Sequence, residues 1–573
     1  MDVSEMATSD SSGEVSPDNA VDGAIDYRGR PASRSSTGRW KSSLFIIGVE
    51  VAERFAYYGI ASNLITYLTG PLGQSTAAAA ENVNAWVGAA SLLPLLGAFI
   101  ADSYLGRYRT IIFASLLYIL GLGLLTLSAI LTSLSTSSSG CNGTASCSSS
   151  RSQVVLFFFS LFLVAVAQGG HKPCVQAFGA DQFDGEDPIE SKEKSSFFNW
   201  WYFSLCAGVT VTLLTVVYIQ DNLNWSLGFG IPCVAMVVAL GVFLIGTRTY
   251  RFSAKRGERK SPFVRIGQVF LTAVRNRRTS APSMAAEEEE AQGLLRSNYD
   301  QYKFLNKALL VPDDSKANVM VCTVREVEEA KSLLRLIPIW FTSLVFAIVS
   351  AQTSTFFTKQ GATMDRTLFS GFKIPAASLQ VFIGLAIVIF VPVYDRVFVP
   401  IARSITHKPS GITTLQRIGT GIFLSIVCMI IAALVEIKRL ETARDYGLVN
   451  SPDATIPMSI WWLVPQYLLF GLAEVFTMVG LQEFFYDQVP DDLRSIGLAL
   501  YLSVFGVGAI LSSFLVAIIE KLTSGSGGDG WFSDNLNKAH LDYFYWLLAG
   551  LSTLGLAAFS YFASSYIYRR RTT

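Results

Sequence analysis

Long apolar runs separated by short polar turns dominate this sequence. A helix needs roughly twenty mostly apolar residues to cross a bilayer, and twelve segments fit that description. We therefore predict an all-α membrane protein whose spans lie near residues 44–68, 83–102, 110–132, 154–176, 197–218, 226–246, 333–355, 378–400, 414–436, 458–482, 496–519 and 542–567.

One long polar interruption divides the spans into six and six. Two pseudo-equivalent halves are a common plan of transporters. The pattern predicts an N-terminal six-helix bundle over 44–246, a linker over 247–332 and a C-terminal six-helix bundle over 333–568. The polar segment 1–43 is expected to be a disordered tail, and 569–573 a short second tail.

Basic residues mark one side of the membrane. The linker begins with a run of Lys and Arg over 248–278, and further arginines lie in the turn after the second span and at 569–571. The positive-inside rule places all of these segments in the cytoplasm. We expect both termini to be cytoplasmic.

Composition supports a lipid environment and excludes several function classes. Hydrophobic residues make up 51% of the chain and charged residues 16%, with a net charge of +1, which is too apolar for a soluble chain and disfavours a nucleic-acid partner. No nucleophile constellation, phosphate-binding loop or heme motif is present, so we expect no enzyme activity and no cofactor. The three histidines are scattered, and no metal site is expected.

The first span contains three ionisable residues, Glu50, Glu53 and Arg54. Charges within a span are costly, so they usually face a cavity and a partner. Positions i, i+3 and i+4 share one helical face, so Arg54 can pair with Glu50 while Glu53 lies alongside. Two carboxylates beside one guanidinium leave one acid only partly compensated, which suits a proton carrier. A static ion pair that only orients the helix is the alternative.

Two further charges lie in spans of opposite halves. Lys172 belongs to the fourth span and Glu474 to the tenth. A site between the halves would have one on each wall. Such walls suit a zwitterion, whereas a small anion would use Lys172 and Arg54; the residues alone leave both open, as they leave open snorkelling of Lys172 to the membrane edge.

A polar loop between the third and fourth spans contains the glycosylation sequon at Asn142, flanked by Cys141 and Cys147. This setting suits a lumenal or extracellular face. A disulfide between the two cysteines is equally compatible with the sequence as two free thiols.

Several ordered motifs together resemble a known family. The segment Glu50-Val-Ala-Glu53-Arg54 is similar to the ExxER motif of the proton-coupled oligopeptide transporter family, whose plant branch is the nitrate transporter 1/peptide transporter family. The similarity continues through Lys172-Pro173-Cys174 and Glu483-Phe484-Phe485-Tyr486. The resemblance implies a major facilitator fold with twelve transmembrane helices and alternating access.

The resemblance also implies roles for individual residues. They are proton coupling by Glu50, Glu53, Arg54 and Lys172; substrate binding by Tyr58, Lys172, Gln352 and Glu474; and gating at the cytoplasmic turn by Asp102, Arg107 and Arg109. Some family members bind nitrate with a histidine that lies just before an Ala-Gln pair. This chain has Ser350 at that position, before Ala351 and Gln352. A histidine-based nitrate site is therefore not expected.

The leading hypothesis is proton-coupled symport of a small nitrogenous solute, such as nitrate or a di- or tripeptide, across a lipid bilayer. The alternatives are an anion uniporter of the vacuolar membrane, driven by voltage, and a sensor that binds substrate without sustained flux. Glu290 with Leu294 and Leu295 is similar to an acidic dileucine sorting signal. This similarity slightly favours the vacuolar membrane over the plasma membrane.

Overall fold

The computed structural model describes most of the chain. The described residues are 20–138, 151–184, 186–253, 262–278, 302–309, 322–369, 371–406, 412–452, 454–490, 493–524, 530–566 and 568. Within them, eleven helices are long and apolar enough to cross a membrane. The all-α membrane fold is confirmed.

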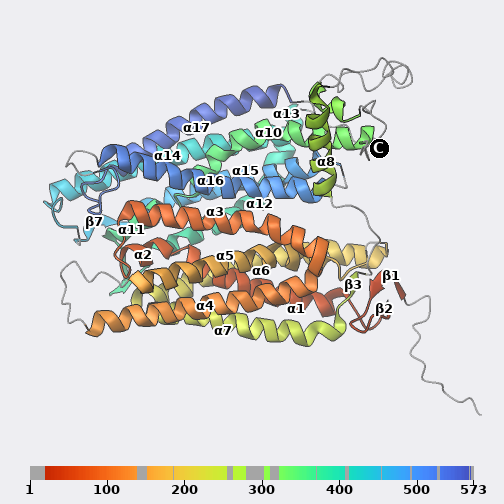
Figure 1. The fold of residues 1–573 in the computed structure, drawn as a ribbon. Helices are drawn as coiled ribbons and strands as arrows, with labels where there is room; N and C mark the ends of the chain where they lie inside the picture. Colours follow the sequence, from red (N-terminus) through yellow and green to blue (C-terminus); the bar gives the residue numbers. More distant parts are fainter. Residues whose placement is uncertain are drawn as a thin grey trace, which may run out of the picture.

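The N-terminal half is a bundle of long helices joined by tight turns (Figure 1). Its helices are α1 (Arg39–Ala61), α2 (Leu64–Thr69), α3 (Thr76–Ile100), α4 (Arg107–Ser138), α5 (Arg151–Ala180), α6 (Pro188–Asn222) and α7 (Trp225–Ile245). Helix α1 is the twelfth long helix among the described residues and packs against α5, α6 and α7. It differs from the eleven apolar spans because it contains Glu50, Glu53 and Arg54.

The C-terminal half repeats this arrangement. Its helices are α10 (Val324–Ser350), α11 (Phe356–Ala362), α12 (Val381–Val393), α13 (Val399–Thr406), α14 (Thr414–Asp445), α15 (Val464–Asp487), α16 (Arg494–Thr523) and α17 (Leu541–Ser564). Helices α3 and α16 form an extensive contact between the halves. Helix α10 begins with a capping box in which Thr323 and Glu326 bond each other's backbone, which satisfies two otherwise unpaired N–H groups.

The basic segments gather at one end of the bundle, which we name the linker end. Helices α8 (Pro262–Arg275) and α13 and the C-terminal end of α17 lie there, whereas α11 and the strand β7 (Ile456–Ser459) lie at the opposite end, named the α11 end (Figure 1). The α11 end also has two small pairings, of β7 with β4 (Met364–Asp365) and of β5 (Thr367–Phe369) with β6 (Phe372–Lys373).

The N-terminal segment differs from the disordered tail expected over 1–43. Residues from Ala20 onward form β1 (Ala20–Ile25) and β2 (Pro31–Ser33), which pair with β3 (Phe252–Ser253) in a three-stranded antiparallel sheet. Helix α1 then begins at Arg39, before the expected start of the span.

Ion pairs explain why this polar segment is ordered. Arg34 contacts Asp184 and Asp187, at 2.6 and 3.0 Å, and the fully buried Arg251 contacts Glu190 at 2.6 Å. Gly38 lies directly against Arg251 with φ at 78°, where a Cβ would overlap the guanidinium. Charge pairing therefore holds the chain here without an apolar core of its own.

Candidate functional site

The three charges of α1 form one buried ionic group. Arg54 Nε donates a hydrogen bond to Glu50 Oε1 at 2.9 Å and lies 3.0 Å from Glu53 Oε2. The exposed fractions are 4% for Glu50, 0% for Glu53 and 7% for Arg54. The helical spacing thus gives the pairing that the sequence predicted, with two carboxylates sharing one guanidinium.

Neighbouring helices complete the surroundings of this group. The hydroxyl of Tyr118, on α4, donates to Glu53 Oε1 at 3.4 Å. Lys172, on α5, interacts electrostatically with Glu50, Glu53 and Arg54. Lys172 makes neither an ion pair nor a hydrogen bond within the described part of the chain, so its ammonium is available to another anion.

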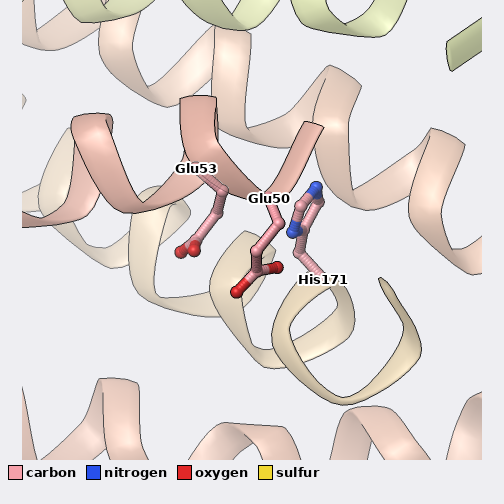
Figure 2. A group of neighbouring side chains, drawn as sticks. All are labelled: Glu50, Glu53 and His171. Atoms are coloured by element: carbon pink, nitrogen blue, oxygen red, sulfur yellow. The ribbon is translucent and has the colours of Figure 1, made fainter. Parts of the chain in front are cut away.

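His171 lies next to the two carboxylates, on the helix that faces α1 (Figure 2). Ligand atoms of Glu50, Glu53 and His171 all lie within 4.8 Å of one another. Such a set can present three donors to a cation, but Arg54 already occupies the space beside both carboxylates with a positive charge. The chemistry therefore favours protons over a divalent cation at this position.

The imidazole of His171 is fully buried, and neither ring nitrogen has a hydrogen-bond partner among the described residues. The sequence did not reveal this proximity, because it depends on the packing of α5 against α1. The only hint in the sequence was that His171 precedes Lys172, the charged residue of the fourth predicted span.

Glu474 belongs to the other half of the molecule. It lies near the middle of α15 and is half-buried. It interacts electrostatically with Tyr58 and Cys206 of the N-terminal half, and with Tyr202 and Tyr501. No cation or hydrogen-bond donor contacts its carboxylate within the described residues.

Aromatic side chains lie close to Arg54 and Glu474. Tyr58 packs edge-on against Tyr57 with ring centroids 5.3 Å apart, and Tyr57 stacks on Trp86 at 5.5 Å. Tyr58 interacts electrostatically with both Arg54 and Glu474. Tyr58 is therefore close to both the ionic group of α1 and the carboxylate of α15.

Gln352 is fully enclosed by packing between α10 and α16. Its exposed fraction is 0%, and its amide nitrogen donates to the Ile348 carbonyl at 2.8 Å and to Ser512 Oγ at 2.9 Å. Its place in a substrate site stays a prediction.

The turn between α3 and α4 contains the expected gating charges. Arg107 pairs with Asp181, at the end of α5, at 2.5 Å, and Arg109 is exposed. The side chain of Asp102 is outside the described residues, as are Asn142, Cys141, Cys147 and the segment 290–295. Arg107 thus links the turn between α3 and α4 to the end of α5.

Comparison with known proteins agrees with this arrangement. Residues 108–532 match the model of the POT family. The chain therefore belongs to the POT family. It is 66% identical to Protein NRT1/PTR FAMILY 5.10 of Arabidopsis thaliana, over 96% of this chain and 97% of that protein, and 61% identical to Protein NRT1/PTR FAMILY 5.14 of the same plant, over 96% and 97%.

Solved structures of POT family transporters share the fold. An auto-inhibited POT family peptide transporter superposes with a TM-score of 0.69 at 22% identity, covering 93% of this chain and 98% of that one. The POT family transporter PepTSo gives 0.67 at 21% identity, covering 92% and 98%. The major facilitator fold expected from the motifs is confirmed.

Proposed function

We propose that this POT family member is a proton-coupled secondary transporter of a small nitrogenous solute. The observation that supports this most is the pair of unpaired charges in the two halves, Lys172 near the ionic group of α1 and Glu474 on α15. A solute bound between them would contact both halves, so its binding can bias the equilibrium between the inward-facing and outward-facing states.

Glu53 is the group that we assign to proton coupling. It is fully buried and shares Arg54 with Glu50. Two carboxylates beside one arginine leave one negative charge in excess, and a proton removes that excess at low energetic cost. Lys172 can pair with Glu53 when the proton leaves, which connects proton release to the occupancy of the substrate site.

The orientation follows from the basic segments. We place the linker end in the cytoplasm, because α8 and α13 bring their arginines to this end. Both termini are then cytoplasmic, and the vacuolar and plasma membranes are both compatible with this topology.

Uptake of labelled nitrate and of a labelled dipeptide into proteoliposomes tests the assignment of Glu474. A dipeptide has an ammonium group that needs a carboxylate partner, whereas nitrate has none. For a peptide substrate we expect Glu474→Gln to lower gradient-driven uptake by about tenfold or more, the loss of one charge-assisted contact of roughly 1.5–3 kcal/mol.

The matched control is Glu441→Gln, which neutralises an exposed carboxylate on α14. It should leave uptake unchanged. Nitrate uptake that survives Glu474→Gln and follows voltage but not the proton gradient would replace the symporter by the anion uniporter. Saturable binding without any flux would instead identify a sensor.

A further inference from the structure

Helix α8 of the linker runs across the direction of the bundle helices (Figure 1). It packs against α10 and against the 3₁₀ turn Lys303–Leu309. Val269 and Ala273 of α8 are buried there in a cluster with Val327 and Ala330 of α10. Since the bundle helices cross the membrane, α8 lies parallel to the membrane plane.

The apolar surface of α8 is wider than its contact with α10. Val264, Leu271 and Val274 are 42%, 71% and 65% exposed. At about 100° per residue these three side chains fall within one arc of about 80°, beside the buried face. Gln268 and Thr272 occupy the remaining side, and Arg265, between them and the buried face, pairs with Glu329 of α10 at 3.5 Å. The helix therefore has separate faces for protein, for an apolar partner and for water.

The position of α8 on α10 indicates what the apolar partner is. Ala330 and Leu334 of α10 contact the α8 cluster, and Ile337 and Phe341 follow each of them by seven residues. Residues seven apart lie on the same helical face. Ile337 and Phe341 are 41% and 66% exposed, so the face of α10 that α8 covers continues directly into a surface that faces lipid.

The height of α8 along α10 fits the membrane boundary. Val327 and Ala330 share the buried cluster with α8, and the apolar run of α10 begins three residues after Ala330, at Leu333. At ~1.5 Å per residue this separation is about 5 Å, which is no more than the thickness of one headgroup layer. The exposed stripe of α8 therefore lies within the headgroup layer, next to the acyl chains.

Basic side chains gather at the C-terminal end of α8. Arg275 and Arg277 are exposed, and Lys307 donates a hydrogen bond to the carbonyl of Arg277, which brings a further basic side chain into the group. Basic groups beside an interfacial apolar stripe favour anionic lipid headgroups.

We propose that α8 is a membrane-surface helix that inserts Val264, Leu271 and Val274 into the linker-side leaflet and binds anionic lipid headgroups through Arg275 and Arg277. This contact fixes the linker to the C-terminal half at the bilayer surface. It is independent of which solute the protein transports and of proton coupling.

Alkylation of the full-length protein in vesicles tests this placement. Leu271→Cys and Thr272→Cys put a thiol on the lipid side and on the water side of the same helical turn. With a membrane-impermeant maleimide present on both sides of phosphatidylcholine/phosphatidylglycerol vesicles, we expect alkylation of the first variant to be about tenfold slower, since a thiol in the acyl layer does not ionise. Peptide mass spectrometry distinguishes these thiols from the natural cysteines.

Two further conditions of this experiment test whether lipid, and not another partner, covers the stripe. In vesicles of phosphatidylcholine alone, or after Arg275→Gln with Arg277→Gln, the difference in alkylation rate between Leu271→Cys and Thr272→Cys should fall to about threefold or less. The reason is that the attraction to anionic headgroups is lost. Equal alkylation of both variants in the anionic vesicles would overturn the proposal. An unchanged tenfold difference in vesicles of phosphatidylcholine alone would also overturn it, because another part of the chain or a second protein would then cover the stripe.

Discussion

At the scale of single residues, the proposed proton coupling depends on Arg54 and its two carboxylates. A buried ion pair is costly to form and still more costly to break, and this group has one acid too many for full neutrality. Lys172 and His171 lie within reach of that excess charge, from the neighbouring helix α5. Protonation of one carboxylate would therefore remove the excess negative charge.

His171 allows a test that separates proton handling from structure. Its two buried nitrogens have no hydrogen-bond partner in the described chain, and an unsatisfied buried group costs about 1–3 kcal/mol. We predict that His171→Leu leaves the melting temperature unchanged or raises it, while it lowers gradient-driven uptake. Both are measured on purified protein, by differential scanning fluorimetry and in proteoliposomes.

Treatment with a chelator is the control for a metal at the same residues. It should change neither stability nor uptake of the natural protein. A loss of stability that one divalent ion restores would show instead that Glu50, Glu53 and His171 are its ligands.

At the scale of helices, close approach depends on glycine. A Cβ on Gly97 of α3 would overlap the carbonyl oxygen of Gly169 on α5, whereas a Cβ on Gly123 of α4 would meet nothing within 4 Å. The helix that contains Lys172 is thus held against α3 by backbone contact. Glycine at position 97 is what allows this contact.

Gly97→Ala should destabilise the protein by about 1–3 kcal/mol, the usual cost of overpacking. The matched substitution Gly123→Ala, also within a helix, should be neutral or stabilising by up to about 1 kcal/mol, because alanine favours the helix. Thermal unfolding in detergent compares the two. Equal melting temperatures for both variants would mean that α3 and α5 separate without cost.

How much was predictable from the sequence depended on the distance between partners along the chain. The long apolar helices and the pairing of Arg54 with Glu50 follow from local periodicity, and both are confirmed. The sheet of β1 with β3 joins residues more than two hundred positions apart, and the burial of Gln352 depends on α16. Such tertiary contacts leave no periodic signal in one sequence.

At the scale of the molecule, hydrogen bonds between the halves gather at the α11 end. Ser378 Oγ donates to the Leu213 carbonyl at 2.6 Å, Gln380 Nε2 to the Ser62 carbonyl at 3.0 Å, and Lys359 Nζ to Thr69 Oγ1 at 3.1 Å. Burial lowers the pKa of Lys359, although Asp534 opposes this effect. These bonds must break when the α11 end opens, so they stabilise the state described here.

Replacing Ser378 and Gln380 together by alanine should weaken this closure by about 1–3 kcal/mol, at roughly 0.5–1.5 kcal/mol for each hydrogen bond. Spin labels on the exposed positions Leu223→Cys and Tyr446→Cys, one in each half, report the opening as a distance distribution. In the double variant, a larger fraction of molecules should show a long distance between the two labels, because the open state is more populated. Ser560→Ala, which removes a bond within α17 only, should leave the distribution unchanged.

Proton coupling through Glu53 is tested most directly by comparing two kinds of uptake in Glu53→Gln proteoliposomes. A gradient of one pH unit supplies about 1.4 kcal/mol per proton, enough for up to tenfold accumulation. We predict that the natural protein uses this gradient, and that the variant loses accumulation but retains exchange of labelled for unlabelled solute, which needs no net proton movement. Accumulation in Glu53→Gln equal to that of the natural protein would contradict the assignment of the proton to this carboxylate.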